Sequence, residues 1–215
     1  MSTPSTPPSN ADSVAGFDAT IPVAVAALEG RARDVESVSG MGEEGAVVQA
    51  WAAARFFITQ VDVDMRVLLR AMAADPHARV TTEKLLALVL RESIDGVHKV
   101  LGNLQRTGRM QTGRFANFID IEALTRAQTA YKTRVREITD DRPFQETLVM
   151  IRNEVAAHMF SNEVGIERAA AWVVNLAASP KTPDAMYQSL IFSRSIDVLR
   201  SLHALDEDLT SVRRM

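Results

Sequence analysis

The chain has no cysteine and is poor in aromatic residues, glycine and histidine. The absence of cysteine from its 215 residues excludes disulfides, thiolate zinc sites and a cysteine nucleophile, and it fits a cytoplasmic location. Only four histidines are available for acid–base chemistry. An aromatic content of 6% and ten glycines, beside abundant alanine and leucine, favour an all-α fold.

Long hydrophobic runs are also missing. No uninterrupted apolar run approaches the ~18 residues that a membrane span requires. The first residues, MSTPSTPPSNADS, have neither the basic group nor the apolar stretch of a secretory signal. We therefore expect a disordered Ser/Thr/Pro-rich tail over residues 1–16, a single helical domain over 17–215, and no membrane partner.

Charge is distributed unevenly along the chain. The net charge of −3 does not suggest a general nucleic-acid binder. Residues 1–50 hold two basic groups against seven acidic ones, whereas residues 99–142 hold nine basic groups against five acidic ones. The basic middle of the chain could therefore attract phosphate.

Apolar residues at three- and four-residue spacing predict an up-and-down multi-helix bundle without an internal repeat. The clearest helix spans 44–74 and stops at Asp75-Pro76, because proline disfavours helix in the residue before it. A loop is expected over 109–118. The other expected helices span 19–36, Thr81 to about Arg91, Ser93 or Asp95 to about Gly108, 120–140, 143–160, 166–178 and 184–205.

The segment Arg152-Asn153-Glu154-Val155-Ala156-Ala157-His158 is the best candidate for chemistry. On an ideal helix, Arg152 and His158 lie on opposite sides of one apolar face and about 9 Å apart along the axis. They would not touch on an isolated helix. Chemistry at this motif requires either a dimer, which brings two copies to a shared groove, or a local break in the helix.

A purely structural interpretation of the same residues stays open. Glu154 precedes His158 by four residues and can hold the imidazole at the rim of the helix. Arg152 can lay its aliphatic stem along the edge of the core.

The segment Met150 to His158 resembles the signature of HEPN domains, in which an Arg and a polar residue precede a His by four to six positions. The order of elements is also similar to the abortive-infection branch of that family. A long helix with early aromatics (Trp51, Phe56, Phe57) precedes a Leu-rich helix (Thr82 to Leu90), and the motif comes later.

The resemblance implies a metal-independent endoribonuclease that acts as a homodimer, often with a nucleotidyltransferase antitoxin. Arg152 and His158 would be catalytic and Asn153 would support them. A histidine with a pKa near ~6.5 can take the proton of a ribose 2′-hydroxyl or protonate the leaving oxygen, and an arginine fork can hold phosphate oxygens. Met159 and Phe160 depart from the pattern, because many relatives have polar residues there.

Residues Lys132, Arg134, Arg136 and Arg142 could guide RNA to this motif, or they could form an ordinary solvated helix face. No metal or other cofactor is expected. Asp95 and His98 lie one turn apart and could offer only two ligands, which are too few for a metal site. No glycine-rich phosphate-binding loop follows an expected strand.

Two other functions remain open. Residues 80–122 look somewhat like a DNA-binding winged helix-turn-helix, with a turn at 91–95 and strands within 109–121. Its DNA-facing residues would be Lys99, Gln105, Arg106, Arg109 and Arg114. Alternatively, the apolar stripe of helix 44–74 could bind a partner helix in a non-catalytic dimerisation or scaffold module.

Overall fold

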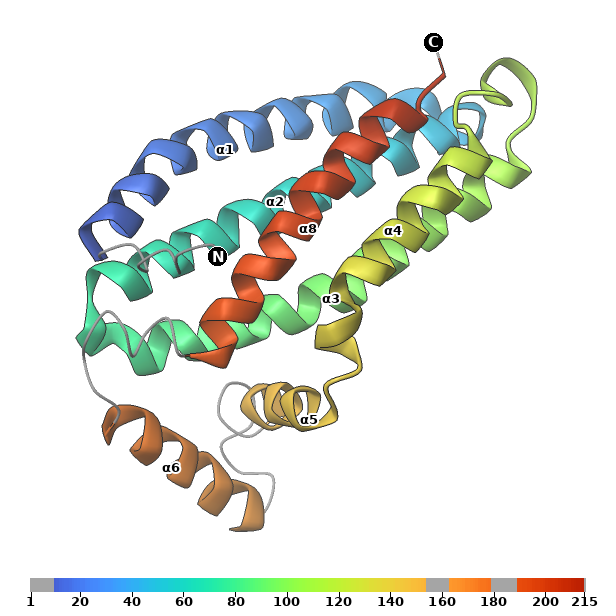
Figure 1. Ribbon diagram of the computed structural model, residues 1–215. Coiled ribbons are helices and arrows are strands. Elements are labelled where there is room, and N and C mark those ends of the chain that lie inside the picture. The colour runs from blue at the N-terminus through green and yellow to red at the C-terminus, as the bar shows by residue number, and fades with distance from the viewer. Residues whose placement is uncertain (1–9, 154–162, 179–188, 215) are drawn as a thin grey trace, which may run out of the picture.

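The computed structural model describes residues 10–153, 163–178 and 189–214, and the fold in these ranges is an all-α bundle, as expected (Figure 1). The α-helices are α1 (Asn10–Val38), α2 (Ala46–Ala74), α3 (Arg79–Met110), α4 (Ile121–Thr139), α5 (Arg142–Met150), α6 (Glu163–Ala178) and α8 (Leu190–Val212). Short 3-10 turns connect some of them: η1 (Ser39–Met41), η2 (Glu43–Gly45), η3 (Pro76–Ala78) and η4 (Gly113–Phe115).

Two regions of the molecule differ in how they pack. Helices α1 to α4 and α8 lie side by side and form what we call the body (Figure 1). The last helix, α8, contacts α2, α3 and α4, so the C-terminal part of the chain completes the core of the body. Helices α5 and α6, which we call the arm, lie to one side of the body and contact it mainly through α3 and α4.

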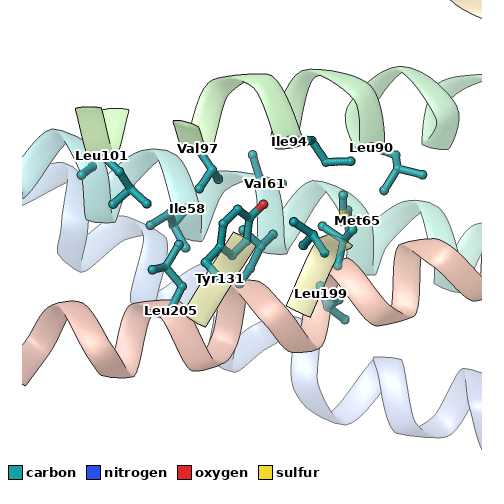
Figure 2. Packing of buried hydrophobic residues seen from close by; sticks show 14 of the residues in the cluster. Ile58, Val61, Met65, Leu90, Ile94, Val97, Leu101, Tyr131, Leu199 and Leu205 are labelled. Atoms are coloured by element: carbon teal, nitrogen blue, oxygen red, sulfur yellow. The ribbon is translucent and has the colours of Figure 1, made fainter. Parts of the chain in front are cut away.

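Helix α2 is the central core helix of the body. Its stripe of Ala54, Ile58, Met65 and Leu69 is almost completely buried. Figure 2 shows Ile58 and Met65 packed among side chains of the other helices. The surface considered for a partner helix is therefore core within this chain. Asp75 follows the helix and accepts a hydrogen bond from the His77 amide, which starts the turn at Pro76.

Helix α3 is continuous through residues 91–95, where the sequence suggested a break. The expectation of separate helices starting at Thr81 and at Ser93 or Asp95 is wrong. Ser93 is buried and donates its hydroxyl hydrogen bond to the Leu90 carbonyl, instead of capping a new helix. Asp95 pairs with Arg91 one turn earlier. The apolar stripe runs unbroken from Leu86 to Leu104, so packing favours one helix.

The same finding removes the winged helix-turn-helix. Residues 80–122 are all described, and they contain no turn at 91–95 and no pair of wing strands. After α3 the chain forms η4 and a single antiparallel bridge between Ile119 and Arg213. The Asp120 amide donates to the Val212 carbonyl and the Arg214 amide to the Phe118 carbonyl, so this segment tethers the C-terminus.

Both terminal helices differ from their expected bounds. Helix α1 begins at Asn10, within the segment expected to be a tail, and its Val14 and Phe17 pack against the buried core. Residues 1–9 lie outside the described residues. Helix α8 extends beyond 205 to Val212 because Leu209 and Val212 are buried; its expected first residues, 184–188, are not described.

The segment Ser13–Met41 has no long uninterrupted apolar run, but its hydropathy averaged over 18 residues is high. By length and composition, Ser13–Met41 could cross a membrane: its best 18-residue window has a mean hydropathy of 1.2, and 6% of that window is buried. The window includes Asp18, whose carboxylate accepts a hydrogen bond from Arg70 of α2 at 2.6 Å. In the fold, α1 packs along α2 as a helix of the body.

Candidate functional site

Arg152 and Asn153 lie at the end of α5, where the helix changes geometry. Asp141 caps the helix by accepting a hydrogen bond from the Phe144 amide at 3.1 Å, and Pro143 occupies its first turn, as expected. Residues 151–153 then adopt a π turn. Ile151 is completely buried, and it holds this turn against the body while the next two side chains are exposed.

The guanidinium of Arg152 pairs with Glu92 of α3. Arg152 Nη2 lies 3.2 Å from Glu92 Oε1, and the two side chains remain 48% and 58% exposed. An exposed ion pair of this kind contributes little stability. The arginine therefore keeps much of its surface open to an anionic ligand that could displace the carboxylate.

A second arginine strengthens the junction between α3 and α5. Arg91 donates from Nη1 to Gln145 Oε1 of α5 at 2.7 Å, and its Nε lies 3.2 Å from Asp95. The hydrogen bond to Gln145 joins α5 to α3 near Arg152, and the pair with Asp95 holds Arg91 in place on α3. No local pattern in the sequence singles out Arg91 or Gln145, because their approach depends on how two helices pack.

The proposed partner of Arg152 is not placed. His158, together with Met159 and Phe160, lies outside the described residues, so the distance between the guanidinium and the imidazole stays untested. The π turn does change the helical geometry on which the expected positions of Arg152 and His158 were based, since π-helical residues turn by less than 100° each.

The four residues expected to guide RNA, Lys132, Arg134, Arg136 and Arg142, do not form one continuous surface. Arg134 faces α8, where its guanidinium lies 3.3 Å from Asp208. Arg142 is exposed at the start of α5. Lys132 and Arg136, four residues apart on α4, share a face and line a common cleft. The structure therefore divides the set and brings only these two together.

The cleft lies between α3 and α4 and has a volume of about 340 Å³. We call it the α3–α4 cleft. Its polar lining comes from His98 of α3 and from Thr129, Lys132, Thr133, Arg136 and Thr139 of α4. In the sequence, His98 drew attention only as a possible metal ligand beside Asp95. Polar residues recur on α4 at three- and four-residue spacing, and this pattern could have predicted a polar helix face. Which α3 residue lies opposite that face depends on how the two helices pack.

His98 is held in a defined orientation at this cleft. Its ring meets the buried Tyr131 ring edge to face, with centroids 5.9 Å apart. Burial lowers the pKa of His98 below its usual value, the Lys132 ammonium lowers it further, and the Asp95 carboxylate opposes both. The imidazole is therefore mainly neutral at physiological pH.

No group of three or more side chains that could hold a metal ion occurs among the residues that the structure describes. Comparison of the chain with protein-family models, with curated proteins and with solved structures finds no match.

Proposed function

We propose that the protein is a HEPN-like RNA-binding protein or metal-independent endoribonuclease in a defence or toxin–antitoxin setting. The observation that carries the proposal is the position of Arg152, half-exposed in a π turn beside Asn153 and six residues before His158 in sequence. π turns inside helices are frequent at functional sites. The resemblance of Met150 to His158 to the HEPN signature supplies the chemistry.

In the proposed reaction, Arg152 leaves Glu92 and holds the non-bridging oxygens of the scissile phosphate. An arginine fork suits this role because it stays charged and can donate two parallel hydrogen bonds. His158 takes the proton of the ribose 2′-hydroxyl, and the 2′-oxygen then attacks the phosphorus. The P–O5′ bond breaks, the leaving 5′-oxygen takes a proton from solvent water, and a 2′,3′-cyclic phosphate remains. Asn153 supports the two groups by hydrogen bonding.

The proposal includes a homodimer and a possible nucleotidyltransferase antitoxin. If the motif faces a second copy of itself across a two-fold axis, two arginines and two histidines meet in one groove. Such an arrangement explains how side chains that do not touch on one helix can act together. Both partners follow from the resemblance to HEPN proteins.

The test is cleavage of a mixed single-stranded RNA pool in the presence of EDTA. The wild type should produce cyclic-phosphate ends, and Arg152→Ala should cut about 10²–10³-fold more slowly, the loss typical for one transition-state donor. His158→Ala should be at least as defective. Arg200→Ala removes an exposed arginine whose nearest carboxylate is 3.8 Å away on its own helix, and it serves as the matched control.

Glu92→Gln sharpens this test. It removes the carboxylate that competes with RNA for Arg152, so RNA should bind more tightly to this variant than to the wild type. Silence of the wild type towards RNA, or equal cutting by all variants at matched fold and oligomeric state, would overturn the nuclease proposal.

A further inference from the structure

We propose that the α3–α4 cleft binds a phosphate group of single-stranded RNA through Lys132, Arg136 and His98. This inference deepens the proposed function and rests on it for the identity of the ligand. Its physical basis is separate, because it comes from the geometry and charge of a cleft on the body and not from the motif at Arg152.

Lys132 has no carboxylate within ion-pair distance among the described residues. Asp95, whose carboxylate acts on His98 at the same cleft, is engaged by Arg91 at 3.2 Å. The ammonium therefore enters the cleft as a cation that lacks a protein counter-ion.

Arg136 and its partner Asp140 are 77% and 65% exposed, so a phosphate can replace the carboxylate at little cost. His98 presents an imidazole that its contact with Tyr131 keeps at the cleft. The hydroxyls of Thr129 and Thr133 already donate to carbonyls of their own helix. The positive charge of the cleft therefore comes from Lys132 and Arg136, and the neutral His98 ring can donate a hydrogen bond to a phosphate oxygen.

A volume of about 340 Å³ lies at the lower end of the range for small-ligand sites and accommodates a phosphate with its sugar. On α3, Glu92 holds Arg152 and precedes His98 by six residues. The two positions are therefore roughly 9 Å apart along the helix axis and about 120° apart around it. The cleft and the Arg152 turn thus adjoin different sides of the same helix.

Binding is tested with a labelled single-stranded RNA of mixed sequence, titrated by fluorescence anisotropy at several salt concentrations. Lys132→Ala should weaken binding about tenfold, as expected for a lost charge-assisted contact. It should also reduce the slope of log K against log salt by about 0.7, the value for one single-strand phosphate. Arg126→Ala, which removes an exposed cation from α4 outside the cleft, is the matched control and should change neither quantity appreciably.

The His98 ring gives a second readout that does not depend on a loss of binding. The charged groups facing it are Lys132, Asp95 and, across the cleft, Arg136. A phosphate beside the ring favours the imidazolium, so RNA should raise the pKa of His98 in an NMR titration. His98→Phe keeps the aromatic contact with Tyr131 and identifies the resonance.

The cleft inference is wrong if Lys132→Ala and Arg126→Ala weaken RNA binding equally, or if RNA leaves the pKa of His98 unchanged. A shift of that pKa by inorganic phosphate but not by RNA would also overturn it, since free phosphate would then be the ligand. The Arg152→Ala protein separates the two proposals. If the wild type does not cut RNA but binding still depends on Lys132, the cleft stands and the nuclease falls. If cutting depends on Arg152 while Lys132→Ala binds RNA normally, the cleft falls alone.

Discussion

The body and the arm of this molecule differ in how deeply they bury their helices. In the body, α2, α3, α4 and α8 each have a buried apolar stripe, whereas α1 lies along α2 and Ala24 is the one buried residue among its described side chains. In the arm, the buried anchors of α5 and the turn after it are Phe144, Leu148 and Ile151, and Val174 of α6 is 64% exposed. The body therefore supplies the stability, and Arg152 lies where less packing holds the chain, as is common for functional segments.

The largest expected effect tests this comparison directly. Leu69 is fully buried in the body, so Leu69→Ala should lower the free energy of unfolding by about 2–5 kcal/mol through lost burial and a cavity. Val174→Ala in the arm should change it by less than about 0.5 kcal/mol. Urea denaturation followed by circular dichroism measures both. Similar losses from the two substitutions would mean that the arm contributes as much to stability as the body does.

A smaller effect concerns two glycines of α3. A Cβ atom at Gly96 would overlap the ring of Phe57 from α2, so Gly96→Ala should destabilise the protein by about 1–3 kcal/mol. Nothing lies within 4 Å of a Cβ atom at Gly102, so Gly102→Ala should stabilise the helix by about 0.5–1 kcal/mol. Thermal unfolding of the two variants should move the melting temperature in opposite directions. If both raise it, α2 and α3 are not in close contact at Gly96.

The smallest change in stability at neutral pH is expected from a substitution of Tyr131, which lies in the centre of the body (Figure 2). Its side chain is fully buried, and its hydroxyl has no hydrogen-bond partner among the described residues. Tyr131→Phe removes an unsatisfied polar group, so it should be neutral or slightly stabilising near pH 7. Clear destabilisation at that pH would mean that the hydroxyl has a partner after all.

The same residue gives a pH dependence. Burial raises the pKa of Tyr131 far above its usual value near 10. Above pH ~10 the unfolded chain therefore loses this proton while the folded chain keeps it, and stability falls as pH rises. The wild type should lose stability on the alkaline side faster than Tyr131→Phe. Urea midpoints measured across that range compare the two proteins, and parallel curves would contradict the prediction.

Local patterns predicted much of the fold. The apolar spacing of 44–74 gave α2 nearly to the residue, Asp75-Pro76 ended it, and Asp141 with Pro143 marked the start of α5. The break at 91–95 was predicted wrongly because Ser93 and Asp95 are typical capping residues. In the folded chain, packing of Leu90 and Val97 on the same stripe outweighs that local preference.

The candidate site likewise has some features that the sequence predicted and others that depend on packing. Arg152, Asn153 and His158 were found from their order in the chain, and their joint action stays a prediction. The pairing of Arg152 with Glu92 and the meeting of His98 with Lys132 were not foreseeable, because each joins residues 34 or more positions apart.

The sequence by itself determined the all-α class, the extent of α2 and the identity of the motif residues, because helix periodicity, caps and residue chemistry are local properties. Only the tertiary structure decided that α3 is one helix, that α8 completes the core, and that Lys132 and Arg136 open onto a cleft while Arg134 faces Asp208. The physical reason is that each of these features depends on which helix faces which, and burial of apolar stripes settles that choice across the whole chain.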